Sequence, residues 1–565
     1  MDTAAASTAA NNEDTQPLLP HGTVRIYDEF RSDGVVLLPH PTSSPNDPLN
    51  WSLARKTLSA SIVLFITALT AATSNSAGSA GDQLVNDYGI TWDQVNAAAG
   101  VLFVGIGYGT LLLSSAPWLY GRRSSYLVCM LFGVIGNAWF AHVRNSGNQI
   151  GSQLFVGMSE AVAEATVQLS LMDLFFQHQR GLALGLYVLA TSVGTFLGPL
   201  IAGVIADSSL GWQWIGWSGA IFSGATLLVT YFGLEETAFE RSSIALASTT
   251  PGVEFGNGSI LDAARQGNNN DEKPSSSAPS EIQADGVHKD KHSAKTDMKL
   301  VEDPIRSPKK TYWQRIAIVT PSPTLIGTGF IQYFTRMWNN ITIMWLPAVV
   351  YAGIQWGFQD AWLTFYLTAE EDNWTSAPYN YSAMTSSMMN IPTLIGAVIG
   401  CVYGGAMSDW FVRQIAKRNN GVYEAEDRLW LMLLPAVLCP IGLIVFGIAT
   451  YRVWPWQAAY VALGFIGFGW GCAGDLSMAY TMDAYPEMVL EGMVGVSVIN
   501  NSLACIFTFV CSQWMSVNNI AEVFSTIGIV AFFIMLPLTL LMIMYGKRLR
   551  VWSTPRYEKF VARRG

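Results

Sequence analysis

The sequence is poor in charge and lacks the residue patterns of common catalytic and nucleotide-binding sites. Only 13% of its 565 residues are charged, about half the usual share in soluble domains. It contains no G-x-x-x-x-G-K-[ST] loop, no visible nucleophile–base set and no metal-ligand cluster, which disfavours an ATP-driven pump, an enzyme and a metalloprotein. The net charge of −9 gives no indication of nucleic-acid binding, and no cofactor is expected.

The sequence also has few cysteines and no recognisable secretion leader. All six cysteines fall in or beside apolar runs, which favours a role as small apolar side chains. The first 50 residues are polar and rich in Pro, Asp and Ser, so no signal peptide is expected. The first apolar helix would then direct its own membrane insertion.

Long apolar runs are what the sequence has in abundance. Its residues are 50% hydrophobic and its mean hydropathy is +0.29. A helix that crosses a bilayer needs about 20 mostly apolar residues. Runs of this kind lie near 57–77, 96–117, 124–142, 151–172, 181–205, 214–234, 340–365, 382–407, 429–450, 457–478, 492–514 and 522–545. This pattern predicts an all-α membrane protein with twelve transmembrane helices in two six-helix bundles.

The polar segments between these runs predict the domain organisation. The expected parts are a largely disordered cytosolic tail at 1–56, bundles at 57–234 and 340–545, a cytosolic linker at 235–339 that is disordered at about 242–310, and a cytosolic tail at 546–565. The linker is expected to be disordered because its Ser, Asn, Asp and Lys residues cannot bury enough apolar surface to fold.

One arginine decides where the seventh helix begins. A helix that began at Thr324 would place Arg336 near the middle of the membrane, at a cost of about 3 kcal/mol. We therefore expect the helix to begin after Arg336, with residues around 316–334 forming an interfacial amphipathic segment.

The distribution of Lys and Arg predicts the orientation. If the N-terminus is cytosolic, the only Lys or Arg residues in the outer loops are Arg144 and Arg452. The inner loops then contain Arg122, Arg123, Arg180, Arg413, Lys417, Arg418 and Arg428. Both termini are therefore expected in the cytosol. Asn373 and Asn380 begin sequons in the predicted outer loop 366–381 and are candidate glycosylation sites.

Several stretches carry a family resemblance. "PWLYGRRSSYL" (117–127) and "GGAMSDWFVRQIAKRNNG" (404–421) together resemble the loop motif G-x-x-x-D-R-x-G-R-R of major facilitator transporters. "GTFLGPLIAG" (194–203) resembles their antiporter motif G-x-x-x-G-P-x-x-G-G. The two sets of six runs match the family's layout. "DPLNW" (47–51) and "YTMDAYPE" (480–487) look like segments of fungal twelve-helix drug:proton antiporters.

The resemblance implies a gate of charged residues at the cytosolic ends of the helices, which would latch one state of an alternating-access cycle. The candidates are Arg122, Arg123, Asp173, Arg180, Asp409, Arg413 and Asp483. The first loop motif has Trp118 in place of the family's Asp. Arg122 and Arg123 have the alternative role of positive-inside anchors.

The resemblance also gives the glycines of the fifth run a role. They form, with one proline, a helix-packing motif of Gly194, Gly198, Pro199 and Gly203. Small residues on one helix face let a neighbouring helix approach closely, and a bundle tolerates the proline. We expect this groove and bend at the interface where the two halves rock.

Acidic residues inside apolar runs are costly and usually functional. Glu160 and Glu164 share one face of the fourth predicted helix, and Asp475 lies in the tenth. We expect these three carboxyls to carry protons, Glu164 first, or alternatively to pair with polar groups on other helices. The family's arginine in the fourth helix is replaced by Gln153, so its proton relay does not carry over.

Other polar and aromatic residues within the runs are candidates for the wall of a substrate cavity. They are Asn75, Tyr108, Gln168, Trp356, Trp470 and Asn500. The aromatic members would suit an apolar or aromatic substrate.

The resemblance favours one function over several alternatives. We expect a monomeric secondary transporter in the plasma membrane that exports a drug, toxin or secondary metabolite in exchange for protons. One alternative is an importer or an intracellular carrier in a peroxisomal or vacuolar membrane. Another is a ligand sensor that transports nothing.

Overall fold

The computed structural model describes residues 21–25, 39, 42, 44–176, 179–239, 309–374, 377–419 and 421–564. The chain separates into two units. The larger comprises Met1–Pro41, Asn46–Phe239 and Lys310–Gly565 and contains every helix and strand discussed below. We call it the membrane unit. Most of the smaller unit, including nearly all of the stretch predicted to be disordered, lies outside the described residues.

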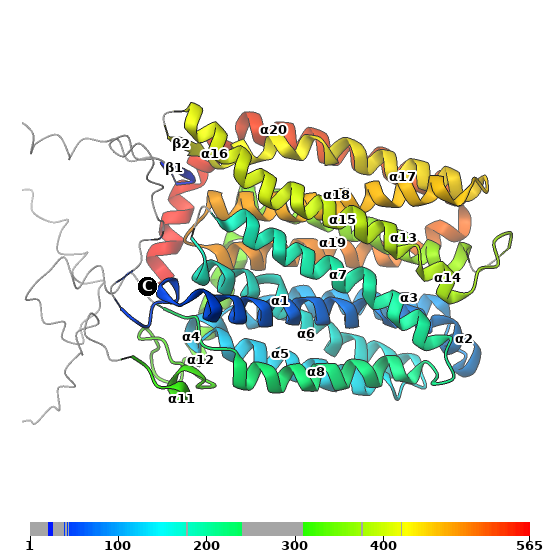
Figure 1. The fold of residues 1–565 in the computed structure, drawn as a ribbon, viewed down its shortest axis with the longest axis horizontal. Coiled ribbons are helices and arrows are strands. Elements are labelled where there is room, and N and C mark those ends of the chain that lie inside the picture. The colour runs from blue at the N-terminus through cyan, green and yellow to red at the C-terminus, as the bar shows by residue number, and fades with distance from the viewer. Residues whose placement is uncertain are drawn as a thin grey trace, which may run out of the picture. The chain divides into compact units, whose positions relative to one another are not determined.

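The first half of the membrane unit consists of six long helices that lie side by side (Figure 1). They are α1 (Leu53–Asn75), α3 (Trp92–Leu113), α5 (Arg122–Phe140), α6 (Ser146–Leu174), α7 (Arg180–Ala206) and α8 (Gln213–Gly233). Between them lie η2 (Ala77–Ala80), α2 (Gly81–Tyr88) and α4 (Ala116–Leu119), and η1 (Pro48–Asn50) precedes them. Side-chain caps fix some starts: Asn145 accepts a hydrogen bond from the backbone amide of Asn148 at 2.8 Å.

The second half repeats this arrangement. Its crossing helices are α13 (Pro347–Asn373), α15 (Asn390–Val402), α17 (Pro435–Tyr451), α18 (Trp456–Ala484), α19 (Val489–Val517) and α20 (Ile520–Arg564). The π-helical turn η4 (Tyr403–Met407) continues α15 into α16 (Ser408–Arg418). The smaller elements are α11 (Tyr312–Arg315), α12 (Phe330–Ile343), α14 (Ala383–Ser387) and η5 (Ala425–Leu433).

The predicted fold class of twelve helices in two sets of six is confirmed. Nine helices in the described part are long and apolar enough to cross a membrane, and the bent pair α12–α13 makes a tenth. The two that complete the set, α5 and α6, carry charges such as Arg122 and Glu160. Glu160 is buried within the bundle, and a helix enclosed by other helices needs less apolar surface than one that faces lipid.

The start of the seventh crossing differs from the prediction. Helix α13 begins at Pro347 rather than near residue 340, and α12 meets it at an angle of 83°. A residue that precedes a proline avoids helical geometry, and Leu346 is extended with ψ 137°. Arg336 therefore lies on α12 rather than on α13, and the helix in the segment predicted to be interfacial spans Phe330–Ile343 rather than 316–334; its position at the membrane interface stays a prediction.

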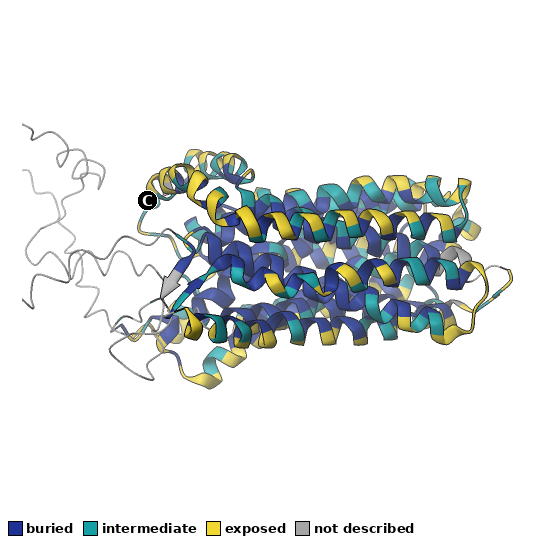
Figure 2. Ribbon diagram, turned by 90° about the horizontal axis from the view of Figure 1, so that it is seen from above, coloured by how far each residue is buried: buried dark blue, intermediate teal, exposed yellow. Residues whose placement is uncertain are grey.

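Exposed residues lie on the outer surfaces of the helices and buried residues face the interior (Figure 2), and many of the exposed residues are large and apolar. Phe65, Leu131, Phe222 and Phe533 are all about half exposed or more. Such a surface is unfavourable in water and suits lipid. Helix α1 begins and α20 ends at one end of the unit, the termini end; the opposite end, which carries α2 and α14, is the far end (Figure 1).

Two glycines of the α7 motif, Gly194 and Gly198, pack against α1 within the first half, whereas Pro199 and Gly203 line a pocket that both halves share. A Cβ on Gly194 would lie 2.2 Å from the carbonyl oxygen of Ala68, and one on Gly198 would lie 2.5 Å from that of Ala72. Both partners belong to α1. Gly194 and Gly198 thus allow close contact between α1 and α7, because that is where the two backbones nearly touch.

Candidate functional site

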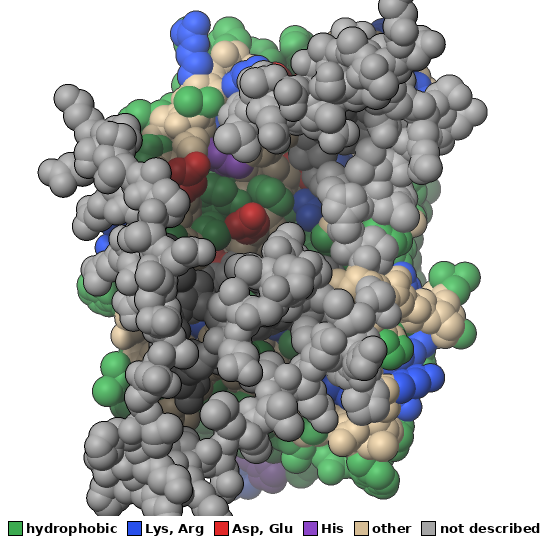
Figure 3. Space-filling view, turned by 90° about the vertical axis from the view of Figure 1, so that its left-hand side faces the viewer, with side chains coloured by type: hydrophobic (Ala, Val, Ile, Leu, Met, Phe, Trp, Pro, Cys, Tyr) green, Lys and Arg blue, Asp and Glu red, His purple; other side chains and the backbone are tan. Residues whose placement is uncertain are grey.

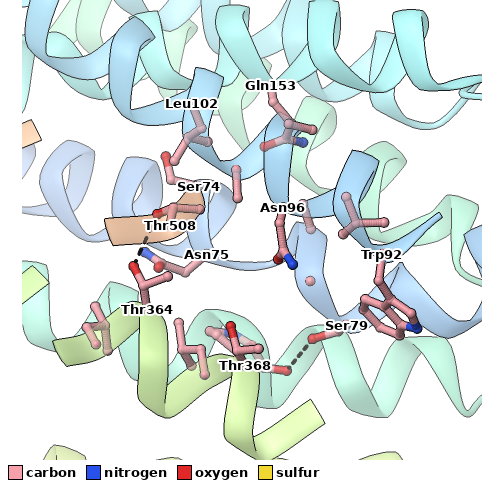
Figure 4. Close-up of a pocket in the computed structure, with 18 of the residues that line it drawn as sticks. Ser74, Asn75, Ser79, Trp92, Asn96, Leu102, Gln153, Thr364, Thr368 and Thr508 are labelled. Atoms are coloured by element: carbon pink, nitrogen blue, oxygen red, sulfur yellow. Dashed lines mark hydrogen bonds between the residues drawn. The ribbon is translucent and has the colours of Figure 1, made fainter. Parts of the chain in front are cut away.

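A pocket between the two halves lies at the far end (Figure 4). It encloses about 1200 Å³, including space open to solvent. Its polar lining includes Ser74, Asn75, Asn96, Gln153, Thr364, Thr368 and Thr508. Thr364 of α13 and Thr508 of α19 are joined by a hydrogen bond of 3.5 Å. Of the predicted cavity residues, only Asn75 lines this pocket.

Three carboxyl groups lie close together in the interior, on the side of this pocket that is nearer the termini end. Glu160 and Glu164 of α6 lie close enough to Asp360 of α13 for their charges to interact. Glu160 is buried, and the other two are partly accessible. No described Lys or Arg forms an ion pair with any of the three within 4.0 Å, in contrast to the carboxyls at the termini end. We call this group the acid cluster.

The acid cluster is surrounded by polar and aromatic side chains from both halves. The indole nitrogen of Trp470 donates a hydrogen bond to Asp360 at 3.3 Å. Ser74 of α1 lies beside Glu160, and Ser497 of α19 lies beside Glu164. The cluster is therefore reached by groups from α1 and α6 in the first half and from α13, α18 and α19 in the second.

Three predicted cavity residues belong to the surroundings of the acid cluster. Asn500 lies beside Asp360. Trp470 also contacts Trp356, with 4.6 Å between ring centroids, and Phe196 of the other half at 5.7 Å. These rings form an aromatic wall next to Asp360.

The other two predicted cavity residues lie elsewhere. Gln168 is buried and donates to the sulfur of Met478 at 3.3 Å. Tyr108 is 50% exposed, and its hydroxyl lies 3.4 Å from that of Ser502. Neither lines the pocket at the far end.

Asp360 was not among the residues predicted from the sequence, although the rule that acids inside apolar runs are usually functional also applies to it. It is an acid inside the predicted run 340–365, as Glu160 and Glu164 are inside theirs. Only the structure reveals that these acids converge, because α6 and α13 belong to different halves.

Asp475 lies apart from the acid cluster, where α7, η4 and α18 meet. Its side chain is fully buried, and neither carboxyl oxygen has a hydrogen-bond partner among the described residues. A Cβ on Gly185, Gly404 or Gly405 would come within 3.2 Å of its Oδ2. Glycines from both halves thus surround Asp475, whose carboxyl group has no hydrogen-bond partner among the described residues.

A network of ion pairs closes the termini end. Arg428 contacts Asp409 at 3.2 Å and Asp483 at 3.3 Å. Arg180 of α7 reaches Asp483 at 3.8 Å, and the backbone amide of Leu182 donates to Asp409 at 2.9 Å. These last two contacts join the halves. We call this network the gate. Charged side chains of both signs are visible at this end (Figure 3).

Of the seven predicted gate residues, Arg180, Asp409 and Asp483 join the two halves. Arg122 pairs with Asp173 at 3.2 Å within the first half. Arg413 donates to the backbone oxygen of Asp409 at 3.1 Å and is not part of the ion-pair network.

Arg123 has another role. It is fully buried and donates to the backbone oxygens of Ile316 and Tyr231. Glu236 accepts hydrogen bonds from the backbone amides of Arg122 and Arg123 at 3.0 and 3.1 Å, which places a carboxylate at the N-terminus of α5. Arg123 therefore joins the linker residue Ile316 to α8 of the first half rather than joining the two halves.

The predicted glycosylation sites lie at the far end. Asn380 is exposed between α13 and α14. Asn373 ends α13, but its side chain and Thr375 of its sequon lie outside the described residues. Glycosylation stays a prediction.

Comparison with known proteins gives consistent results. A family model described as Major Facilitator Superfamily matches residues 62–509. An MFS-type transporter of Schizosaccharomyces pombe is 48% identical over 96% of this chain and 94% of its own length. Protein HOL1 of Saccharomyces cerevisiae is 46% identical over 94% of this chain and 92% of its own length. The solved structure of the proton:xylose symporter XylE has a TM-score of 0.55 at 13% identity, covering 87% of this chain and 96% of that one, which shows likeness of fold alone.

Proposed function

As a member of the Major Facilitator Superfamily this chain is a multi-pass membrane transporter, and we propose that it exchanges a positively charged organic molecule for protons. The observation that carries this proposal is the acid cluster of Glu160, Glu164 and Asp360. The cargo would be a drug, toxin or secondary metabolite that is exported. The fungal drug:proton branch, predicted from the sequence, is part of this proposal.

The charge of the cargo follows from the surroundings of the acid cluster. Carboxylates buried in a membrane protein need a partner of opposite charge or a proton. No described basic side chain forms an ion pair with the cluster within 4.0 Å, in contrast to the carboxyls at the termini end, which are paired with arginines. A cationic cargo would supply the missing charge, and the aromatic faces of Trp356 and Trp470 next to Asp360 favour a cation as well.

Exchange follows from competition for the same groups. A carboxyl that holds a proton cannot also act as an anionic partner for a cation, so binding of one excludes the other. This mutual exclusion is what an exchanger requires. Where the outside is more acidic than the cytosol, protons would enter on the cluster and the cation would leave.

The gate and the pocket correspond to one state of an alternating-access cycle. Ion pairs close the termini end, and the pocket of about 1200 Å³ lies at the far end. The excess of Lys and Arg at the termini end supports placing it in the cytosol. The structure would then represent the state that faces away from the cytosol, in which protons load and cargo departs.

The test uses the purified transporter in liposomes with a pH-sensitive dye inside. A panel of organic ammonium compounds is compared with neutral isosteres in which carbon replaces the charged nitrogen. We expect proton movement with some ammonium compounds and with none of their isosteres, because only charged cargo competes with protons for the carboxyls.

Two variants complete this test. Glu164→Gln keeps the shape of the side chain and removes its charge, so cation-driven proton flux should fall, whereas Glu487→Gln, an acid outside the membrane helices, should leave it unchanged. Equal flux with neutral isosteres, or unaltered coupling in Glu164→Gln, would overturn the proposal.

Asp475 supports a second candidate function, which is proton-coupled uptake. It is an unpaired acid separate from the acid cluster, so a proton there and a cation at the cluster could travel together. In that case proton and cargo move in the same direction in the liposome assay, and Asp475→Asn rather than Glu164→Gln abolishes coupling. The sign of the dye signal therefore separates the two candidates.

A further inference from the structure

We propose that the N-terminal segment His21–Arg25 is a regulatory clamp that holds the gate at the termini end closed. This clamp segment docks on Val422–Arg428, the gate loop, which precedes α17 and contains Arg428. The inference rests on alternating access, which the family implies, and not on the identity of the cargo.

The docking begins with backbone hydrogen bonds. Strand β1 (Thr23–Arg25) pairs antiparallel with β2 (Val422–Glu424), so that Val24 lies opposite Tyr423. The amide of Ala425 donates to the carbonyl oxygen of Gly22 at 3.0 Å. The two-stranded sheet therefore joins a segment near the N-terminus to a loop about 400 residues later in the chain.

A buried arginine ties the same two segments to α20. Arg550 forms a two-point ion pair with Glu426 of the gate loop, at 3.1 and 2.8 Å. Its remaining nitrogen donates to the carbonyl oxygen of His21 and to the hydroxyl of Thr23, the latter at 3.1 Å. Because Arg550 is almost completely buried, the clamp segment completes the hydrogen bonding of a charge that would otherwise face solvent or a void.

His21 and Gly22 pack closely against α20 and Tyr485. The imidazole stacks on the rings of Tyr557 and Tyr485, with centroids 4.7 and 5.5 Å apart. Gly22 has φ +79°, and a Cβ there would lie 2.8 Å from Nη1 of Arg550. A glycine is needed both for the backbone conformation and for the close approach.

The clamp connects to the gate through Tyr423. This residue lies opposite Val24 in the sheet, and its hydroxyl donates to Asp483 at 2.8 Å. Asp483 in turn contacts Arg428 and Arg180, the latter from the other half. Strand pairing fixes the backbone that carries Tyr423, and through it holds Asp483 and Arg428 where α7 meets them.

Opening at the termini end requires Arg180 and Leu182 to leave Asp483 and Asp409. A docked clamp stabilises the gate loop in the arrangement that fits these partners, so it favours the closed state. Release of the clamp lowers this preference and increases the fraction of molecules that open towards the side of the termini.

Cys401 provides a readout that does not depend on cargo. Its sulfur is buried and lies 3.9 Å from the hydroxyl of Ser192 on α7, at a contact between the two halves. With the other five cysteines replaced by serine, a membrane-impermeant maleimide is added to vesicles whose termini end faces the medium. The rate of Cys401 alkylation then reports the open population.

Two variants release the clamp and one locks it. Gly22→Val and His21→Ala should each speed alkylation about fivefold, the factor that corresponds to loss of one net hydrogen bond or stacking contact. A disulfide between Arg25→Cys and Val422→Cys, which are paired in the sheet, should slow the alkylation of Cys401, which is read on its own peptide by mass spectrometry because the added cysteines also react. Reduction, with the reductant removed before labelling, should restore the rate. Val422→Cys alone is the control for the disulfide.

The matched control for Gly22→Val is Gly89→Val. Gly89 also has positive φ, +67°, but nothing lies within 4 Å of a Cβ there, so alkylation should stay at the parental rate. If both release variants fold, as judged by thermal unfolding, and alkylate at the parental rate, the clamp is only a structural contact and the proposal fails. Loss of cation transport with the expected alkylation pattern would refute the proposed cargo and leave the clamp standing.

Discussion

The backbone amide of Leu182 donates a hydrogen bond to the carboxylate of Asp409 at 2.9 Å. The amide belongs to the first turn of α7, where helical amides lack partners within the helix, and the carboxylate belongs to α16 of the other half. One half of the transporter thus caps a helix of the other, and the cap must be lost whenever the termini end opens.

Weakening this contact should shift the transporter towards the open state. Asp409→Asn keeps an acceptor oxygen but removes the charge that holds Leu182 and Arg428. Hydrogen bonds to charged groups contribute about 1.5–3 kcal/mol, so we expect Cys401 to be alkylated about tenfold faster or more. Arg413→Ala, which loses only a bond to the backbone oxygen of Asp409, is the control and should change little. Equal rates in the two variants would contradict this account of the gate.

The close contact of α1 with α7 predicts a sharp size limit. Gly194→Ala places a methyl group 2.2 Å from a carbonyl oxygen of α1, so the helices must separate and the yield of folded protein should fall severely. Gly224→Ala, in α8, has its nearest neighbour 3.9 Å away and should fold normally. Fluorescence-detected size-exclusion chromatography measures both, and a normal profile for Gly194→Ala would show that the contact is looser than described.

The anchoring role of Arg123 predicts a loss of stability rather than a change in gating. Arg123→Met fills similar space but leaves the carbonyl oxygens of Ile316 and Tyr231 without their donor. We expect about 3 kcal/mol of destabilisation, seen as a lower unfolding temperature in detergent. Cys401 alkylation in the surviving folded protein should match the parent. Faster alkylation at unchanged stability would instead place Arg123 in the gate.

The clamp segment should respond to acidification. Burial, and secondarily the charge of Arg550, lowers the pKa of docked His21 from 6.5 to about 4. Docking therefore favours neutral imidazole: its full strength is present above pH 6.5 and declines as the pH falls from 6.5 towards 4. The groups that face His21 are Arg550, Thr554, Tyr485 and Tyr557.

The measurement compares the parent with His21→Phe, which retains a stacking ring and cannot be protonated. The ratio of their Cys401 alkylation rates at each pH cancels the titration of the thiol itself. The parent should become relatively faster as the pH is lowered from about 7.5 to 5.5. A constant ratio would mean that His21 protonation does not affect docking.

Much of the fold could be predicted from the sequence because membrane-crossing helices are set by length and apolarity, which are local properties. One exception has a local cause and the other depends on a contact between distant parts of the chain. Pro347 sets the start of α13. Strand β1 lies in the N-terminal tail, which was expected to be largely disordered. The sequence of the tail does not indicate this strand, because its partner, Val422–Glu424, is about 400 residues away in the chain.

The candidate site was less predictable because it depends on which helices meet. Glu160 and Glu164 could be singled out as intramembrane acids, but their convergence with Asp360 requires the packing of α6 near α13. Arg428 was counted as a positive-inside residue, yet it is the centre of the gate because η5 places it between Asp409 and Asp483. The family motif pointed to Arg413 instead, one turn after Asp409.

The most direct test of the proposed exchange is the number of protons released when a cation binds. Isothermal calorimetry in two buffers with different ionisation enthalpies gives this number for the purified transporter. The account predicts proton release on binding to the parent, and less release with Glu164→Gln. Binding of a transported cation with no change in bound protons would contradict it.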